Sequence, residues 1–178
     1  MDVQKIRGLY KKRAVVDNNV LNDFYELDRM DLLTRVFGRV CVPESILWNE
    51  TPDDIRTALR QIDYETVSLY TEEGYGLMYQ LLTEWTGLSE YDAELIAIAG
   101  QDMIVCTSNE KRIINACESY GIEYTGTLGI LCCAYERRLI GREEFKGLID
   151  RLFSDECSCH LHPRLKNQIY KQYHLQDV

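Results

Sequence analysis

The sequence predicts an α/β fold, a three-layer α/β/α sandwich with a central parallel sheet. Short apolar runs typical of strands alternate along the chain with longer segments whose apolar residues recur at helical spacing. This alternation indicates parallel strands joined by helices that cover both faces of the sheet. The chain has 178 residues, of which 46% are hydrophobic, and this is enough for one substantial core.

The predicted strands are brief β-branched or apolar runs that stop at polar residues. They cover residues 13–17, 39–42, 103–107 and 123–125, and 66–70 is either a strand or an extended connector. Ligands of parallel sheets bind beyond the carboxyl ends of the strands. Polar residues directly after a strand, such as Asp17, are therefore the first candidates for a functional site.

The predicted helices carry recognisable start signals. Thr51 precedes Pro52 and two aspartates, which predicts a threonine cap for a helix that runs to about residue 62, and Ser89 is predicted to cap the helix 90–99. Pro43 is expected to open another helix. The other helices are predicted in a short leader, from residue 20, and over about 31–37, 71–85, 110–120, 128–139, 142–153 and 164–173.

One domain is expected over residues 1–178, with a core at about 13–139 and a helical C-terminal extension at about 140–178. Most of the seven cysteines lie in apolar runs, where a reduced thiol behaves as a small hydrophobe. The first residues lack an apolar segment of signal-peptide type, and no run of 18 apolar residues occurs. We therefore expect a cytoplasmic protein and no membrane partner.

The net charge of -9 argues against a protein that coats nucleic acid with a broad basic face. It does not exclude a nuclease, which concentrates carboxylates at one spot, offsets them with metal and needs only a local basic rim. Each cluster of basic residues that could form such a rim is also typical of a solvated helix face. The candidates are Lys11, Lys12 and Arg13, then Lys111 and Arg112, then Arg137, Arg138 and Arg142.

Several segments in order along the chain resemble PIN domains. They are VVDNNVL at 15–21, VPESILWNE at 42–50, LSEYDAELIAIA at 88–99, CTSNEKRI at 106–113 and GTLGIL at 126–131. The resemblance spans roughly residues 13–139, and the G-T-L-G-x-L segment is similar to a bacterial and archaeal subgroup, many members of which look like toxins of toxin–antitoxin pairs. It implies a PIN-like fold and a Mg²⁺- or Mn²⁺-dependent ribonuclease. The partners it implies are an RNA substrate, an antitoxin protein and a second copy of the chain.

The same resemblance assigns the site residues. Metal-binding carboxylates fall on Asp17, Asp92 and Glu110, and the family's second acid falls on Asn49 or, after a one-residue shift, on Glu50. Asp17, Asp92, Glu110 and Glu50 are thus the candidate catalytic residues. The residues expected to support them from a second layer are Asn18, Asn49, Glu94, Ser108 and Asn109.

The chemistry of these residue types favours the same site. Two unit charges 4 Å apart repel by about 4 kcal/mol at an effective dielectric of ~20, so converging carboxylates need a cation. Hard oxygen ligands without histidine or cysteine favour Mg²⁺ or Mn²⁺ over zinc. Such an ion activates water for attack on a phosphodiester and stabilises the leaving oxygen.

Each candidate also has a structural interpretation. Asp17 is suited to cap the helix that follows it, and Asp92 completes a capping box with Ser89, although Asp92 shares a helical stripe with Ile96 that turns it toward the core. Glu94 lies two positions after Asp92 on the predicted helix, so the two side chains point in different directions. Asn109 and Glu110 suit a helix start as well as a site, and Glu50 is typical of an exposed loop carboxylate.

Two alternative functions and one further cluster remain. A PIN-like module without catalysis that binds a protein partner or RNA is favoured by Asn49 and Asn109, which occupy nominally acidic positions. A receiver-type phosphoacceptor domain is less favoured, since its acidic pair and its lysine are not evident. Cys157, Cys159, His160 and His162 are too tightly spaced to close a four-ligand zinc site alone, which predicts a polar loop with incidental thiols.

Overall fold

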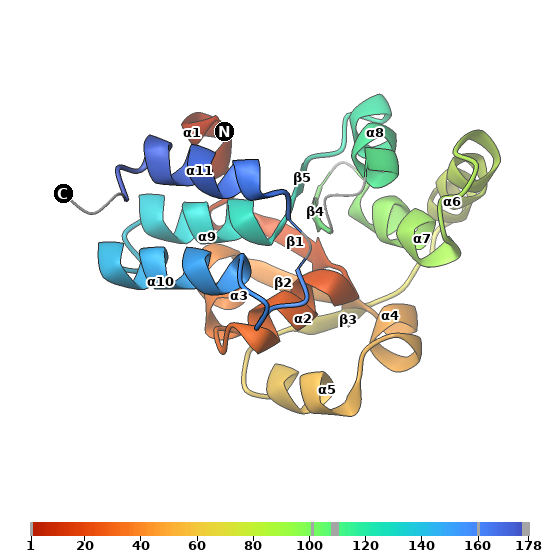
Figure 1. The fold of residues 1–178 in the computed structure, drawn as a ribbon. Helices are drawn as coiled ribbons and strands as arrows, with labels where there is room; N and C mark the ends of the chain where they lie inside the picture. Colours follow the sequence, from red (N-terminus) through yellow and green to blue (C-terminus); the bar gives the residue numbers. More distant parts are fainter. Residues whose placement is uncertain (1, 101, 108–110, 160, 176–178) are drawn as a thin grey trace.

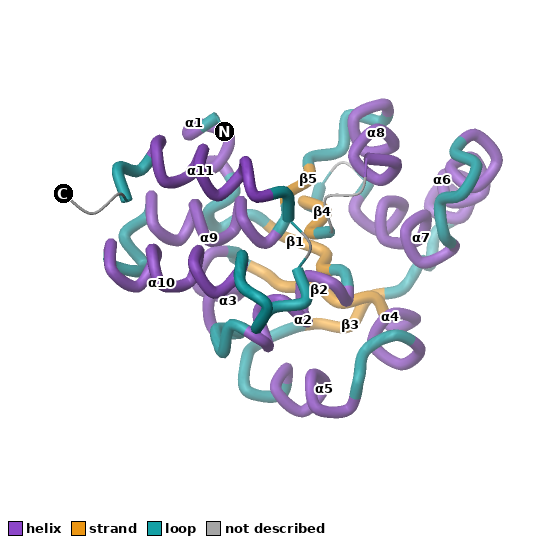
Figure 2. The backbone as a smooth tube through the Cα atoms, in the orientation of Figure 1, coloured by secondary structure: helices purple, strands orange, loops and turns teal. Residues whose placement is uncertain are grey.

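The structure is a computed structural model that describes residues 2–100, 102–107, 111–159 and 161–175. Within these ranges five short strands form one sheet, with helices packed on both faces (Figures 1 and 2). All neighbouring strands are parallel, in the order β3-β2-β1-β4-β5. They are β1 (Arg13–Val16), β2 (Arg39–Pro43), β3 (Glu65–Val67), β4 (Ile104–Cys106) and β5 (Tyr124–Thr125). The predicted three-layer α/β/α sandwich is confirmed.

The helices begin and end within a few residues of the predicted limits. They are α1 (Val3–Gly8), α2 (Asn18–Glu26), α3 (Asp31–Val36), α4 (Glu44–Asn49), α5 (Asp53–Leu59), α6 (Glu72–Glu84), α7 (Glu90–Ala99), α8 (Lys111–Ser119), α9 (Thr127–Glu136), α10 (Arg142–Leu152) and α11 (Pro163–Gln172). In the described part of the chain, none of them combines the length and the apolar character that a membrane crossing requires.

Alternate residues of the central strand belong to two separate cores. Ala14 and Val16 pack with residues of α2, α3, α9 and α10, whereas Val15 packs with residues of α6, α7 and α8. The strand register aligns Ala14 with Val40 of β2 and with Ile104 of β4. Each row of side chains therefore crosses the sheet and faces one core. Burial on both faces explains why β1 is a continuous apolar run that ends at the first polar residue.

The predicted cap at Thr51 is wrong. Helix α5 begins after Pro52, and no side chain caps its first turn. The hydroxyl of Thr51 instead donates to the backbone carbonyl of Ile46 at 3.0 Å. Thr51 is buried, and its hydroxyl joins the backbone N–H groups of Glu50 and Thr51, which already donate to the same carbonyl at 3.0 Å. Thr51 therefore belongs to the end of α4 and does not start the next helix.

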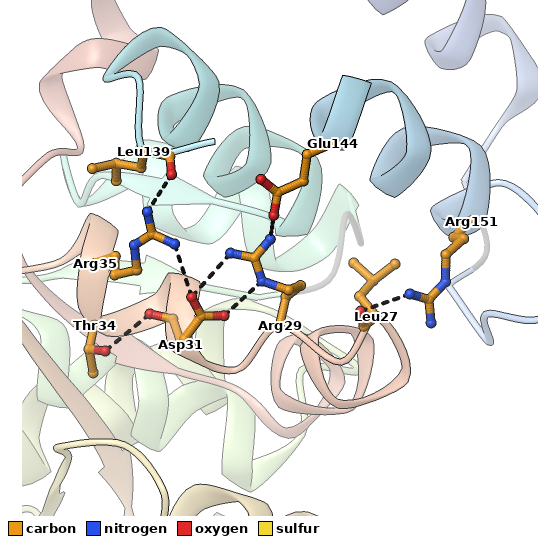
Figure 3. Close-up of polar contacts among 8 residues, drawn as sticks. All are labelled: Leu27, Arg29, Asp31, Thr34, Arg35, Leu139, Glu144 and Arg151. Atoms are coloured by element: carbon orange, nitrogen blue, oxygen red, sulfur yellow. Dashed lines mark hydrogen bonds and ion pairs between the residues drawn. The ribbon is translucent and has the colours of Figure 1, made fainter. Parts of the chain in front are cut away.

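Arginine side chains fasten the C-terminal helices to α2 and α3 (Figure 3). Arg29 binds both carboxylate oxygens of Asp31, at 2.8 and 3.1 Å, and forms an ion pair with Glu144 of α10. Arg35 binds Asp31 at 3.1 Å and also donates to the carbonyl of Leu139. The hydrogen bonds from Arg29, and then those from Arg35, lower the pKa of Asp31 below its usual range. The carboxylate therefore stays charged and bridges the two arginines.

A second arginine contact closes the end of α2. Arg151, in the last turn of α10, donates to the carbonyl of Leu27 at 3.0 Å (Figure 3). It also donates to the carbonyl of Glu26 at 2.7 Å. The last carbonyls of a helix have no partner within the helix and carry the negative end of its dipole. A guanidinium from α10 therefore holds the C-terminus of α2 in place.

We expect Arg29→Met to lower the free energy of unfolding by about 2 kcal/mol, since bonds to charged partners are worth roughly 1.5–3 kcal/mol each and part of the loss is recovered by hydration. The methionine keeps the apolar stem but removes the bonds to Asp31 and Glu144. Urea denaturation of both proteins measures the difference. Arg60→Met, at an exposed position after α5, is the matched control and should change stability by less than about 0.5 kcal/mol. Equal losses from both variants would contradict this account.

Candidate metal site at the carboxyl edge of the sheet

Three acidic residues reach one edge of the sheet from different elements. Asp17 directly follows β1, the central strand of the sheet. Asp92 lies in the first turn of α7, a helix that packs against β1 and β4. Glu50 is the residue at which α4 ends, after the strand β2. The carboxyl end of the central strand is thus the meeting point that the sequence analysis expects.

Local backbone geometry fixes the carboxylate of Asp17. Its backbone N–H donates to the carbonyl of Cys106 at 2.8 Å, which extends the pairing of β1 with β4 by one residue, and its carbonyl then starts α2 by accepting from Leu21. Its side chain accepts from the backbone N–H of Asn18 at 2.7 Å and from the side chain of Asn19 at 3.1 Å. A usual cap binds the second or third N–H of a helix, so Asp17 holds the cap position without the usual capping bond.

Burial and neighbouring charge both act on this carboxyl group. Asp17 is 5% exposed, and burial raises its pKa to about 6, with Asp92 as the next cause and Glu50 as a smaller one. The hydrogen bonds from Asn19 and Asn18 oppose the rise. Burial also raises the pKa of Glu50, and the charge of Asp92 adds to it. The three carboxylates are therefore close enough to repel one another.

Asp92 caps α7 and also places a negative charge near Asp17. Its side chain accepts from the hydroxyl of Ser89 at 2.7 Å and from the backbone N–H of Ser89 at 3.3 Å, and its own N–H donates to that hydroxyl at 3.0 Å. The predicted capping box is present. The box fixes Asp92 in an orientation from which its charge still raises the pKa of Asp17.

The three carboxylates do not form a tight cage. In the described part of the chain, one group of at least three acidic, histidine or cysteine residues has its ligand atoms within 4.8 Å of one another, and it consists of Asp23, Glu26 and Cys157. Asp17, Glu50 and Asp92 are more widely spaced than this. Mg²⁺ commonly keeps several waters and takes only one or two protein carboxylates, so the wider spacing suits it.

The expected supporting residues differ in their positions. Asn18 begins α2, and its side-chain oxygen is buried without a hydrogen-bond partner among the described residues. Glu94 accepts from the hydroxyl of Ser45 and so ties α7 to α4. Asn49 is exposed at the end of α4. The expected roles of Ser108, Asn109 and Glu110 fall outside the described residues.

Thr107 also lies at this end of the sheet, although it is not among the site residues predicted from the sequence. It directly follows β4, is 1% exposed, and its hydroxyl is buried without a partner among the described residues. Its backbone N–H donates to the carbonyl of Thr125 at 3.1 Å, which holds it at the same edge as Asp17. In the sequence, a threonine at the end of an apolar run is assigned to the strand itself. The available signal was its polar character at the strand end.

The donor groups fit a hard divalent cation. The acidic side chains at this edge offer oxygen atoms. The buried oxygens of Asn18 and Thr107 add to them, because Asn18 lies just beyond the end of β1 and Thr107 directly follows β4. Mg²⁺ and Mn²⁺ prefer such ligands, whereas zinc favours sites with imidazole or thiolate. A bound cation would also remove the repulsion that raises the pKa of Asp17.

Fold and site together define an α/β domain with a ligand site at the carboxyl edge of a parallel sheet, lined by carboxylates. The chain matches the family model DUF3368, described as a PIN domain, over residues 13–174. It therefore belongs to the PIN-domain family, and the predicted family is confirmed. No curated protein matches the chain. PIN domains are generally nucleases, and PIN nucleases usually use divalent metals.

The raised pKa of Asp17 predicts a stability change without metal. Its folded-state pKa of about 6 exceeds the ordinary value of 3.8. Below the ordinary pKa both states bind the proton, and above the folded pKa the folded state carries the full cost of the charge. A difference of about two units corresponds to roughly 3 kcal/mol. In chelator near neutral pH, Asp17→Asn should therefore raise the free energy of unfolding by up to about 3 kcal/mol.

The pH profile checks the cause of this gain. It should shrink steadily as the pH falls through about 6 and vanish below about 4, because the native carboxyl is then protonated in both states. Thermal or urea unfolding across this range measures it. Asp63→Asn, at an exposed position, removes the same charge from the net total and should leave the profile unchanged. A destabilised Asp17→Asn protein at neutral pH would overturn the electrostatic account.

Proposed function

We propose that the protein is a Mg²⁺- or Mn²⁺-dependent endoribonuclease that hydrolyses RNA phosphodiesters at the carboxyl edge of the sheet. The observation that carries the proposal is the convergence of three carboxylates: the charges of Asp92 and Glu50 add to burial in raising the pKa of Asp17, and the charge of Asp92 adds to burial in raising the pKa of Glu50. Membership of a nuclease-like family supports it. Glu110 is proposed as a further metal ligand on the strength of the sequence resemblance.

The proposed role of the site residues is to bind the cation and to orient the reacting groups. Asp17 offers a carboxylate that two hydrogen bonds already hold in place, so little side-chain freedom is lost on binding. Ser89 holds Asp92 in the same way. Glu50, which lies at a helix end and is more exposed than Asp17, is the carboxylate with room to move toward a substrate or a water molecule. A bound divalent cation supplies Lewis acidity and a more acidic water.

A local basic rim is the proposed contact for the RNA backbone. Lys111 and Arg112 begin α8 after the segment that follows β4, and Arg112 donates to the carbonyl of Gly87 at 3.0 Å, two residues before the cap of α7. These residues therefore lie near the carboxyl edge. Lys12, by contrast, precedes β1 at the opposite edge and is paired with Glu123 at 2.5 Å. Arg112 already serves the fold through Gly87, so the proposed phosphate contact close to the acidic site is Lys111, at the start of α8.

Two of the other rim candidates already serve the fold. Arg137 donates to the carbonyl of Arg7 and lies over the ring of Tyr10, and Arg142 donates to the carbonyl of His174. These contacts join α9, α10 and the two ends of the described chain. We therefore place no substrate contact on Arg137 or Arg142.

The toxin role rests on the resemblance alone, because packing accounts for the glycine-rich segment. Gly126 precedes α9, and Thr127 donates from its hydroxyl to Asp23 at 2.5 Å. A Cβ at Gly129 would lie 2.3 Å from the hydroxyl oxygen of Thr125, so a larger residue would collide there. A short DNA-binding protein encoded beside this one would support an antitoxin partner in the cytoplasm, and gel filtration would test for a homodimer.

A non-catalytic PIN-like module that binds RNA or a protein is the second candidate. The exposed amide of Asn49 occupies a position where the family carries an acid, and this observation favours it. The coupling of Glu50 to Asp17 favours the nuclease, because the neighbouring carboxylate supplies the missing charge. The two candidates differ in whether Mn²⁺ stabilises the protein and promotes RNA cleavage.

We expect Asp17→Asn and Asp92→Asn each to lower the rate of RNA cleavage by at least about 100-fold, the usual scale for loss of a group that positions the reacting centre. Both should also lose the rise in melting temperature that Mn²⁺ gives the native protein. Cleavage of a fluorescent RNA in Mn²⁺ and thermal melts with and without Mn²⁺ measure the two effects. Asp63→Asn is the control and should behave like the native protein.

Activity and stability are expected to change in opposite directions for Asp17→Asn, which separates loss of function from loss of fold. A variant that melts higher in chelator yet does not cut RNA fits a metal-binding carboxylate. Native-rate cleavage by this variant would rule out the proposed site. A native protein that binds RNA but neither cuts it nor responds to Mn²⁺ would establish the non-catalytic module.

A further inference from the structure

A second group of potential metal ligands lies away from the carboxyl edge of the sheet. Asp23 and Glu26 are three residues apart on α2 and so share one face of the helix. Cys157 reaches them from the loop between α10 and α11, and the ligand atoms of the three residues all lie within 4.8 Å of one another. The thiol of Cys159 donates to the carboxylate of Asp23. We call these four residues the α2–loop cluster.

The loop is bound closely to α2 around this cluster. Glu26 accepts from the backbone N–H of Ser158 at 2.7 Å, from its hydroxyl at 3.1 Å, and from the thiol of Cys157. Asn22 donates to the hydroxyl of Ser158 at 2.7 Å. The residue between the two cysteines therefore anchors the loop on α2. Both thiols are held over the two carboxylates.

Burial makes this arrangement unusual for a surface loop. Asp23 is 7% exposed and Cys157 is 8% exposed. A buried carboxylate is costly unless strong partners compensate for its lost hydration, and a thiol is a weak hydrogen-bond donor. Asp23 also accepts from the hydroxyl of Thr127. An incidental polar loop, as expected from the sequence, does not explain why two carboxylates and the thiol of Cys157 have their ligand atoms within 4.8 Å of one another.

The donor set matches zinc. Thiolates are soft ligands that select Zn²⁺ over Mg²⁺ and Ca²⁺, and aspartate and glutamate are accepted beside them in four-coordinate sites. The cysteine segment cannot close such a site alone, and the structure adds the two missing ligands from α2. An open hollow of about 630 Å³ lined by Cys157, Cys159 and Asp155 adjoins the cluster and gives an ion access.

We propose that the α2–loop cluster binds one Zn²⁺ ion through Asp23, Glu26, Cys157 and Cys159. Binding forms two Zn–S bonds and breaks two S–H bonds, and both protons pass to the solvent. No electron transfer is involved. The ion fastens the α10–α11 loop to α2, the helix that Asp17 precedes. This structural site is distinct from the carboxylate site at the sheet edge, and it does not depend on the proposed ribonuclease activity.

Cobalt substitution tests the site on the full-length, reduced protein. Co²⁺ bound by thiolates gives an intense sulfur-to-metal charge-transfer absorption that carboxylate sites lack. We expect this absorption to grow to a plateau at one equivalent of Co²⁺ and to disappear when Zn²⁺ is added. No such absorption in the native protein would overturn the proposal, because the cluster would then be only a hydrogen-bonded contact.

Matched variants locate the ligands. Cys157→Ala and Cys159→Ala should each weaken Co²⁺ binding at least about tenfold, the scale set by loss of one ligand or its support. Cys117→Ala makes the same change at a buried cysteine in the other core, and Asp17→Asn changes the sheet-edge site; both should keep the absorption. Retention of the absorption in a Cys157→Ala, Cys159→Ala double variant would refute the assignment.

Alkylation of the native protein gives a test that needs no variant to fold. Cys159 is partly exposed, and burial and then the carboxylate of Asp23 raise the pKa of its thiol. A maleimide should therefore label it slowly in chelator over a long incubation, and Zn²⁺ should slow that labelling at least about tenfold further. Mass spectrometry identifies the labelled residue. Equal labelling rates with and without Zn²⁺ would show that the thiols do not bind the ion.

Discussion

The burial of one carboxylate at the end of the central strand constrains the rest of the molecule. Strand β1 is paired on both sides and covered on both faces, so Asp17, the next residue, remains buried. Its charge lies among other carboxylates, which raises its pKa and costs stability whenever no cation is present. The surrounding structure must therefore supply the stability that offsets this cost.

That stability comes largely from what surrounds α2. The helix starts at Asp17, and Arg151 of α10 binds its last carbonyls. Between these ends, Asp23 accepts from Thr127 at the start of α9, so α2 is tied to both helices that cover it. A helix held at its start, middle and end cannot shift without disturbing the position of Asp17. Helix α10 therefore matters to the sheet-edge site, although it lies outside the segment that carries the sequence resemblance.

The sequence predicts well those features that local patterns determine. The β-branched runs gave the four definite strands within a residue or two, and Ser89 gave the capping box of α7. The prediction from the sequence failed at Thr51, whose side chain binds back to α4 and does not cap α5. Only the packed corner between the two helices shows which of them Thr51 binds. The α2–loop cluster was also hidden. Asp23 and Glu26 resemble solvated helix residues until a loop more than a hundred positions later covers them.

The acidic character of the chain limits how RNA could reach the sheet-edge site. At a net charge of -9, long-range attraction cannot draw RNA to the protein, so contact must depend on a few cations close to the acidic edge. Most of the basic residues considered are already engaged: Arg29, Arg35 and Arg151 join helices across the C-terminal half. The start of α8 is the basic segment that adjoins the carboxylates. In the proposed function, a narrow contact beside a metal centre would select the substrate, and the cation would offset both the carboxylates and the phosphate that approaches them.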